Sequence, residues 1–524
     1  MTHRAWGYHI LALVCAVVLG ACAAPSRSSD AITLLALAEP SRLDPRFPED
    51  ALGAALGRLV YRGLMDSDPR TFLPRPALAE SVSWRDATHV RVRIRDDARF
   101  HDGTKVTAGD VAATFESILD AARGSRLRST YARVLRGVSV LGERDVEFEL
   151  HRPDGTFESL MQLPIMPTRD AHGPELRANR GAERRFNGAG DVRVASLAPG
   201  QWEFTRALSQ DGRPSRLRVL SLHDVNTLAQ RLLHGDGDVA EIKPELFEVF
   251  EGRRDFSMES APSAGFTFLG VRCTAEGLGD RRVRAALAHA IDRERLRVGK
   301  LGAHALRATG PIAPSHWAYE GDVERYPYDP ARARALLDEA GLRDPPGPAP
   351  RARWTLRISS QRFAVVVAQA IAAMLAEVGI EVTVRPSELA TLLSDLRQGQ
   401  FDLTFLTIPD LSDPWGLAFW FSSSSIPTAA NPGAGGNRWR FRNDALDRAL
   451  EAGARAVGPD ARAPSYRVAQ QILAHELPVI PLWHADVVFV ATRRFRGLAP
   501  TGDGRLNFLL DLTNAPTRPA SPER

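Results

Sequence analysis

Residues 354–421 alternate between two spacings of apolar side chains, and this alternation constrains the fold more than any other feature of the chain. Strands are predicted at 354–358, 380–384 and 401–407, and helices at 363–378 and 388–397. Strands and helices that alternate at these lengths predict parallel strands joined by right-handed crossovers. We therefore expect a doubly wound α/β sheet, whose ligands bind outside the carboxyl ends of the strands.

An earlier stretch carries a second set of consistent local signals. Residues 91–95 alternate as a strand, and the dipeptide Asp102-Gly103 that follows is a turn signal. Thr107 and Asp110 have the spacing of a capping box, in which each side chain accepts a hydrogen bond from the other residue's backbone N–H. A strand, a turn and a helix are therefore expected in this order.

The first 30 residues carry the marks of export and lipid attachment. Arg4, an apolar run at 10–18 and the small residues before Cys22 predict a secretory signal peptide at 1–21. Cys22 stands directly after the cleavage site, where a lipid acceptor is expected, and 22–30 is predicted to be a lipidated, flexible tether. The alternative is a signal peptide in which Cys22 is incidental. We expect an exported protein, anchored to the cell membrane on its periplasmic or extracellular side.

The composition describes a globular body with no nucleic-acid-binding face. The chain is 44% hydrophobic and 25% charged, and it has no second long apolar stretch. Its 524 residues predict two or three subdomains. The formal charge of +4 is spread among interspersed Arg, Asp and Glu, without a basic stripe. Beyond the first 22 residues the only cysteine is Cys273, expected to be a buried inert thiol.

Motifs of catalysis and of metal binding are missing from the sequence. There is no G-x-S-x-G, no phosphate-binding loop and no paired-cysteine zinc pattern, and His475-Glu476 does not continue as H-E-x-x-H. We therefore predict a binding protein rather than an enzyme, with no cofactor and no metal site.

Five blocks resemble, in the same order, the signature regions of the family 5 extracellular solute-binding proteins, the receptor components of dipeptide, oligopeptide and nickel ABC importers. The most characteristic block is 100–111, Phe-His-Asp-Gly-Thr-Lys-Val-Thr-Ala-Gly-Asp-Val. The other four lie at 280–292, 328–341, 410–414 and 477–483. The resemblance covers nearly the whole mature chain.

This resemblance implies an α/β periplasmic-binding-protein fold of type II, cluster C, in which two lobes close on a ligand. It places lobe I in three segments, at 31–75, 185–272 and 485–524. An extra inserted domain would take 76–184, and lobe II would take 273–484. Hinge motion at the strands that link the lobes would close the cleft.

The resemblance also nominates a ligand-binding carboxylate. Family peptide receptors pair the ligand's α-ammonium group with an Asp in a D-Y-x-(D/E)-P-like loop, and Asp410 falls on that position. A carboxylate at a strand end in a water-poor cleft selects an amine by a charge-assisted hydrogen bond. The alternative is that Asp410 is an ordinary turn residue. Asp413 precedes Pro414 and is predicted to cap a helix that begins there.

Three other residues are candidate ligand contacts. Arg272 stands where the family has Asn, and it could bind a ligand carboxylate or be exposed or paired within the protein. Trp415 and Trp439 flank the loop and offer large rigid surfaces. Thr407 and Leu411 replace aromatic residues of the family pattern, which leaves the ligand class open.

We predict the substrate-binding component of an ABC importer, which captures peptides or another amine-bearing solute and delivers it to a membrane permease. The expected partners are the ligand, the permease complex and, through Cys22, the membrane, and the protein is expected to be a monomer. The alternatives are a metal chelate, haem or an oligosaccharide as ligand, or a secreted hydrolase or signalling receptor on the same fold.

Overall fold

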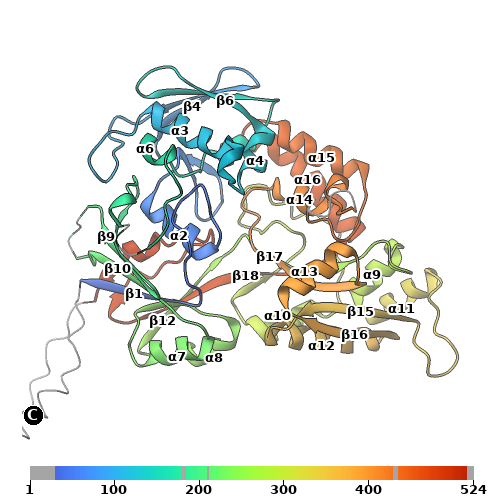
Figure 1. The fold of residues 1–524 in the computed structure, drawn as a ribbon. Coiled ribbons are helices and arrows are strands. Elements are labelled where there is room, and N and C mark those ends of the chain that lie inside the picture. Colours follow the sequence, from blue (N-terminus) through green and yellow to red (C-terminus); the bar gives the residue numbers. More distant parts are fainter. Residues whose placement is uncertain are drawn as a thin grey trace, which may run out of the picture.

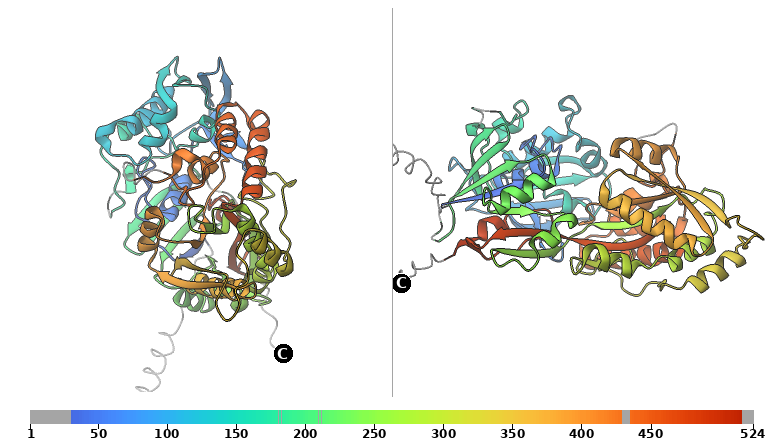
Figure 2. Two further views of the ribbon diagram at one scale, coloured as in Figure 1. Left: turned by 90° about the vertical axis from the view of Figure 1, so that its right-hand side faces the viewer. Right: turned by 90° about the horizontal axis from the view of Figure 1, so that it is seen from below.

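The computed structural model describes residues 30–179, 181, 183–208, 210, 212–428 and 435–515. Cys22, the predicted signal peptide and nearly all of the predicted tether lie outside the described residues. The described chain forms two α/β halves, with a smaller sheet and its helices above them (Figures 1 and 2). Within the described ranges, no helix is both long and apolar enough to cross a membrane.

One large sheet runs through both halves and is organised by its longest strand, β18 (Val479–Thr492). The first part of β18 pairs with β13 (Phe266–Val271) and β14 (Ala305–Arg307). Its second part pairs with β11 (Val239–Glu241) and β12 (Phe256–Pro262). Figure 1 shows β18 crossing between the halves. The chain also passes between them from β12 to β13, ahead of the predicted boundary at 272/273, because β13 already belongs to the second half's sheet.

The first half is built on β1, which lies between two strands that come much later in the chain. β1 (Ala31–Ala36) runs parallel to β10 (Arg216–Ser221) and to β11. The sheet continues from β10 to β9 (Gln201–Arg206) and β8 (Val192–Ala198). Its helices are α2 (Ala51–Val60), α7 (Val225–Leu233), α8 (Phe247–Phe250) and α17 (Phe508–Asp511). Two short ribbons, β2–β3 (Met65–Ser67, Pro74–Pro76) and β19–β20 (Phe495–Arg496, Thr513–Asn514), complete this half.

The second half confirms the predicted alternation of strands and helices. β15 (Ala352–Ser359) is parallel to β16 (Ile380–Ser387) and to β17 (Leu403–Ile408), and α12 (Arg362–Ala376) and α13 (Leu389–Gln398) connect them. β13 is antiparallel to both β17 and β18, so the sheet is mixed. The remaining helices are α9 (Arg281–Ala290), α10 (Arg293–Leu301), α11 (Pro330–Glu339), α14 (Gly416–Phe421), α15 (Asp444–Arg455) and α16 (Pro459–Glu476).

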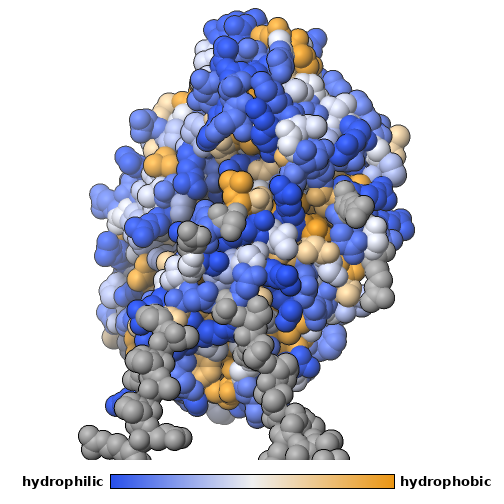
Figure 3. All heavy atoms as spheres, turned by 90° about the vertical axis from the view of Figure 1, so that its left-hand side faces the viewer, coloured by the Kyte–Doolittle hydropathy of each residue, from blue (hydrophilic) through white to orange (hydrophobic). Residues whose placement is uncertain are grey.

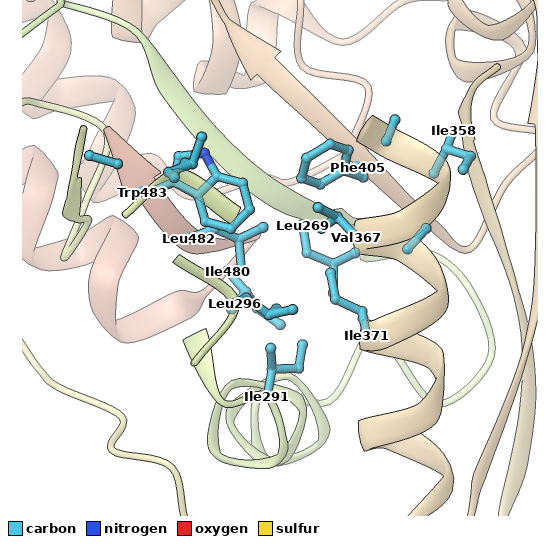
Figure 4. Close-up of a cluster of buried hydrophobic side chains, with 14 of the residues drawn as sticks. Leu269, Ile291, Leu296, Ile358, Val367, Ile371, Phe405, Ile480, Leu482 and Trp483 are labelled. Atoms are coloured by element: carbon cyan, nitrogen blue, oxygen red, sulfur yellow. The ribbon is translucent and has the colours of Figure 1, made fainter. Parts of the chain in front are cut away.

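The core of the second half forms where α12 packs on the sheet. Val367 and Ile371 of α12 are fully buried and face Leu269 and Ile480 (Figure 4). These side chains recur at helical spacing on α12 and at strand spacing on the sheet, which is why the sequence pattern predicts both elements. The face of the molecule in Figure 3 is mostly hydrophilic, with scattered apolar groups.

A four-stranded antiparallel sheet forms the smaller unit. Its order is β4-β5-β7-β6, from Ala79–Trp84, His89–Ile94, Asp145–Leu150 and Leu135–Val140. Its helices are α3 (Ala108–Leu119), α4 (Arg128–Val134), α5 (Phe157–Leu160) and α6 (Thr168–Ala171). A single 3₁₀ turn of this unit lies at Ala121–Arg123, and three others lie elsewhere in the chain, at Glu183–Arg185, Pro244–Leu246 and Ser423–Ser425. We call residues 79–171 the upper unit. It has a hydrophobic cluster of its own, centred on Phe115 and Phe148.

The predicted capping box at the start of α3 is confirmed. The Thr107 hydroxyl accepts from the Asp110 N–H, and an Asp110 carboxylate oxygen lies 2.9 Å from the Thr107 nitrogen. The other Asp110 oxygen accepts from the Thr168 N–H at 2.8 Å. The cap therefore also holds α6 against α3.

Candidate ligand-binding cleft

A cavity of about 320 Å³ opens where the two halves and the upper unit meet. Helix α2 contributes Arg58, and Tyr61 follows the end of this helix. The upper unit contributes Tyr131 and Ser159, and the loop after β17 contributes Ser412 and Asp413. Arg505 and Asn507, near the end of the described chain, close another side. The volume is within the range of small-molecule sites. Its position at the end of β17 agrees with the predicted location of a ligand outside the strand ends.

An ion pair under the loop fixes one wall of the cavity. Arg462 of α16, whose side chain is 1% exposed, lies with Nη2 2.9 Å from Asp413 Oδ1. Asp413 also accepts from the Ser159 hydroxyl of the upper unit and, at 2.8 Å, from the Trp415 N–H. Burial alone would raise the pKa of Asp413, but the Arg462 charge and these hydrogen bonds outweigh burial and lower it. The loop, α16 and the upper unit are thus joined at one carboxylate.

The prediction that Asp413 caps a helix starting at Pro414 needs correction. Helix α14 begins at Gly416, and its N-cap residue, Trp415, makes no side-chain capping bond. Asp413 does accept from a backbone N–H two residues on, as a capping residue would. Its strongest partner is Arg462, which is 49 residues away in the sequence and which the local pattern could not show.

Asp410 lies at the predicted place, just past the end of β17, and its side chain is exposed. One carboxylate oxygen accepts from the Ser412 N–H at 2.8 Å, which holds the loop in a tight turn. Among the residues that the structure describes, none forms an ion pair with Asp410. Ser412 and Asp413, which follow it in the same loop, line the cavity, so Asp410 lies beside it.

Arg272 lies at the opposite end of the same strand pair. Its Nη2 is 2.9 Å from Asp402 Oδ1, and its Nε donates to the Phe401 carbonyl. β13 and β17 are antiparallel, so Arg272 follows the end of β13 that pairs with the start of β17. At about 3.3 Å per residue, the six residues of β17 place this end roughly 17 Å from the Asp410 end. This geometry favours the interpretation that Arg272 is paired within the protein.

The two candidate tryptophans lie in different surroundings. Trp415 is half-buried, and its ring lies under the Arg133 guanidinium of the upper unit, 5.0 Å from the ring centroid. Trp439 is 0% exposed and packs against Phe268 and Gly270, so close that a β-carbon at Gly270 would lie 2.3 Å from its ring. Of the four predicted contacts, the structure therefore brings Asp410 and Trp415 to the loop beside the cavity.

None of the cavity's lining residues was predicted from the sequence as a ligand contact, and Arg58 is the one among them that bears most on ligand binding. It is the only charged side chain in the helix sequence Ala-Leu-Gly-Ala-Ala-Leu-Gly-Arg-Leu-Val. A single arginine in an apolar helix is a signal that the sequence does contain, although it does not show which way the side chain points. Within the described ranges, no cluster of three or more His, Cys, Asp or Glu could hold a metal ion.

Two linked α/β halves with a cavity at their junction define the protein as a two-lobe solute-binding protein. Residues 74–428 match the model of the bacterial extracellular solute-binding proteins, family 5. The chain belongs to this family, which confirms the resemblance and the predicted role in solute binding.

Relatives with assigned names share low identity over nearly the whole chain. Protein XP55 of Streptomyces lividans is 28% identical and aligns with 96% of this chain and 93% of its own length. The glutathione-binding protein GsiB of Shigella boydii is 25% identical, with 87% and 89% covered. A probable di/tripeptide-binding protein 5 of Pseudomonas aeruginosa is 26% identical, with 86% and 89% covered.

Solved structures confirm the two-lobe fold. The ABC transporter substrate-binding protein CtaP of Listeria monocytogenes superposes with a TM-score of 0.81 at 19% identity, over 92% of this chain and 99% of that one. NikA of Brucella suis, in complex with Fe(III)-EDTA, gives 0.80 at 20% identity, over 93% and 100%. At these identities the likeness supports the fold alone.

Proposed function

We propose that the protein is the solute receptor of an ABC importer and that it captures small peptides or other amine-bearing solutes in the cleft beside Asp410. The observation that carries this proposal is an exposed carboxylate with no ion-pair partner among the described residues, at a strand end beside a ligand-sized cavity. Relatives named for glutathione and for di- and tripeptides support an amine-bearing ligand. The receptor binds and releases its solute and carries out no chemistry on it.

The same proposal includes a division into lobes and a closing motion. The division is the one that the resemblance implies: lobe I at 31–75, 185–272 and 485–524, the extra domain at 76–184 and lobe II at 273–484. We change it at one point, by assigning β13 (Phe266–Val271) to lobe II, so that the chain crosses between the lobes after β12. Ligand that contacts both lobes stabilises the closed form. Bending would occur in β18 near Ala485 and Asp486, where its partners change from one half to the other.

Replacing Asp410 by Asn is expected to weaken amine binding strongly. The change removes the charge that pairs with the ligand ammonium inside the closed cleft, so affinity should fall by roughly 30-fold to several thousand-fold. Titration calorimetry with trialanine, glutathione and N-acetyl-trialanine measures this effect. The acetylated peptide should bind the wild type poorly and be nearly indifferent to Asp410→Asn.

Glu248→Gln is the matched control, because Glu248 is an exposed carboxylate of α8 away from the cleft. A thermodynamic cycle that combines the wild type and Asp410→Asn with trialanine and N-acetyl-trialanine isolates the interaction between Asp410 and the ligand's ammonium group. Zero coupling, or a wild type that binds none of the three peptides, would remove Asp410 from the site and direct the search to solutes without an amine.

We further propose that Cys22 carries the membrane anchor. The proposal rests on the sequence before and after Cys22 and on the family's extracellular character. Labelling cells with a tagged fatty acid should mark the wild type, whereas Cys22→Ser should be unlabelled and either released or left uncleaved. Cys22→Ser protein that is cut before residue 22 and still sediments with membranes would refute the anchor.

A further inference from the structure

Within the described ranges, every charged group that lines the cavity has an ionic partner, with the exception of Arg58. Four arginines and three aspartates line it. Asp44, Asp66 and Asp413 are each paired with an arginine. The other three arginines are also paired, Arg42 with two glutamates, Arg62 with Asp191, and Arg505 with Asp66 and Asp503.

Arg58 projects from the face of α2 that carries Gly53, Ala54 and Gly57, all of which line the cavity. In the described part of the chain, no residue accepts a hydrogen bond from its guanidinium or forms an ion pair with it. Arg58 is itself exposed to solvent. The surrounding protein, and secondarily the Arg505 charge, lower the pKa of Arg58, while Asp410, Asp503 and Asp66 raise it.

A guanidinium in this position can accept an anion as its partner. Arg keeps its proton throughout the physiological range and presents five N–H donors in a planar fork that matches a carboxylate. When the cleft closes and water leaves, a guanidinium without a partner becomes costly, whereas one that binds an anion becomes favourable. As far as the described residues show, the cavity lining therefore has one uncompensated positive charge, that of Arg58.

We infer that Arg58 binds a carboxylate of the solute, and that the cleft therefore selects ligands with an anionic end. This inference deepens the proposed function and rests on it. With Asp410 beside the same cavity, a short zwitterion would offer its ammonium group to Asp410 and its carboxylate to Arg58. The two ends are recognised from different lobes, so a ligand that satisfies both would hold the cleft closed.

The test compares trialanine with its C-terminal amide, which lacks the carboxylate. By titration calorimetry, Arg58→Gln should weaken trialanine binding by at least about 30-fold and leave the amide within about 3-fold of the wild type. Arg58→Lys should retain part of the trialanine affinity. Arg231→Gln, at an exposed position of α7 in the same half, is the matched control and should bind as the wild type does.

The melting temperature of Arg58→Gln should match that of the wild type, because the guanidinium contacts no acceptor among the described residues. A second probe, Fe(III)-EDTA, carries carboxylates but no ammonium group. If Arg58→Gln weakens the binding of this probe and Asp410→Asn does not, the carboxylate that Arg58 binds belongs to a chelate. The inference about Arg58 would then stand even if the proposal for peptides failed.

Three outcomes would overturn the inference. Arg58→Gln could weaken trialanine and its amide equally, as it would if Arg58 closed on Asp410 instead of on the ligand. It could leave trialanine and Fe(III)-EDTA binding unchanged. The wild type could bind neither probe.

Discussion

Asp44→Ala is expected to lower the free energy of unfolding by about 3–5 kcal/mol, because it leaves a buried guanidinium without its counter-ion. The side chains of Asp44 and Arg46 are both 0% exposed, and Arg46 Nη2 lies 2.6 Å from Asp44 Oδ2. Arg46 also donates to the Ala171 carbonyl at 2.7 Å, and Asp44 accepts from the Leu176 N–H at 2.9 Å. The pair thus ties the segment before α2 to the end of the upper unit.

Urea denaturation, followed by tryptophan fluorescence and circular dichroism, measures the effect. Asp97→Ala is a suitable comparison, because Asp97 pairs with Arg95 at 2.6 Å but both side chains are more than half exposed. Water solvates Arg95 after this change, so stability should alter little. Equal losses of unfolding free energy in Asp44→Ala and Asp97→Ala would mean that burial does not set the strength of the Asp44–Arg46 pair.

Arg462→Met should be comparably destabilising, by about 3–5 kcal/mol at neutral pH. The substitution leaves the Asp413 carboxylate without its cation and removes a guanidinium that packs 5.4 Å from the ring centroids of both Trp317 and Tyr466. The Ser159 bond that joins the upper unit to this carboxylate loses its support as well. We expect a lower urea midpoint and easier separation of the upper unit from α16.

The loss in Arg462→Met should depend on pH in a defined direction. In the wild type the folded-state pKa of Asp413 is lowered, so the pair stabilises the fold above the unfolded-state pKa and this contribution is lost as pH falls through the folded-state pKa. Without Arg462, burial raises the pKa of Asp413, and protonation then favours the folded variant. The difference between the two proteins should therefore begin to shrink above the unfolded-state pKa of about 4, where Asp413 takes up a proton in the folded variant, and should go on shrinking as pH falls through the lowered pKa of the wild type.

Urea midpoints at neutral pH and in acid check this dependence, and Asp413→Asn introduced into Arg462→Met serves as the control. The double variant has no titrating carboxylate at this position. Its stability should therefore lack the gain that protonation of Asp413 gives Arg462→Met in acid. A stability gap between Arg462→Met and wild type that stays constant with pH would show that Asp413 does not titrate with folding.

The elements that the sequence predicted correctly are those fixed by neighbours in the chain. The β15–β17 region follows from the spacing of apolar side chains, and the Thr107–Asp110 cap follows from two residues that lie three apart. β18 could not be predicted in full, because a strand of 14 residues that contains Pro481 and changes partners midway is defined by its distant neighbours.

The same distinction between local and distant neighbours explains which residues of the site could be predicted. Asp410 could be placed beside a cleft because the position of a strand end follows from local pattern and from the family resemblance. The partners of Arg272 and Asp413, and the lack of a partner for Arg58 among the described residues, could not be predicted, because they depend on which side chains the fold brings within a few ångströms. Asp402 is 130 residues from Arg272, and Arg462 is 49 residues from Asp413.

The placement of β1 and β18 has a consequence for when the protein can fold. β1 pairs with β10, which is about 185 residues later, and β11 pairs with the second part of β18, near the C-terminus. Both halves of the large sheet therefore stay incomplete until almost the whole chain is available. For an exported chain, this topology means that neither lobe has its full set of strands before the segment that forms β18 has been made.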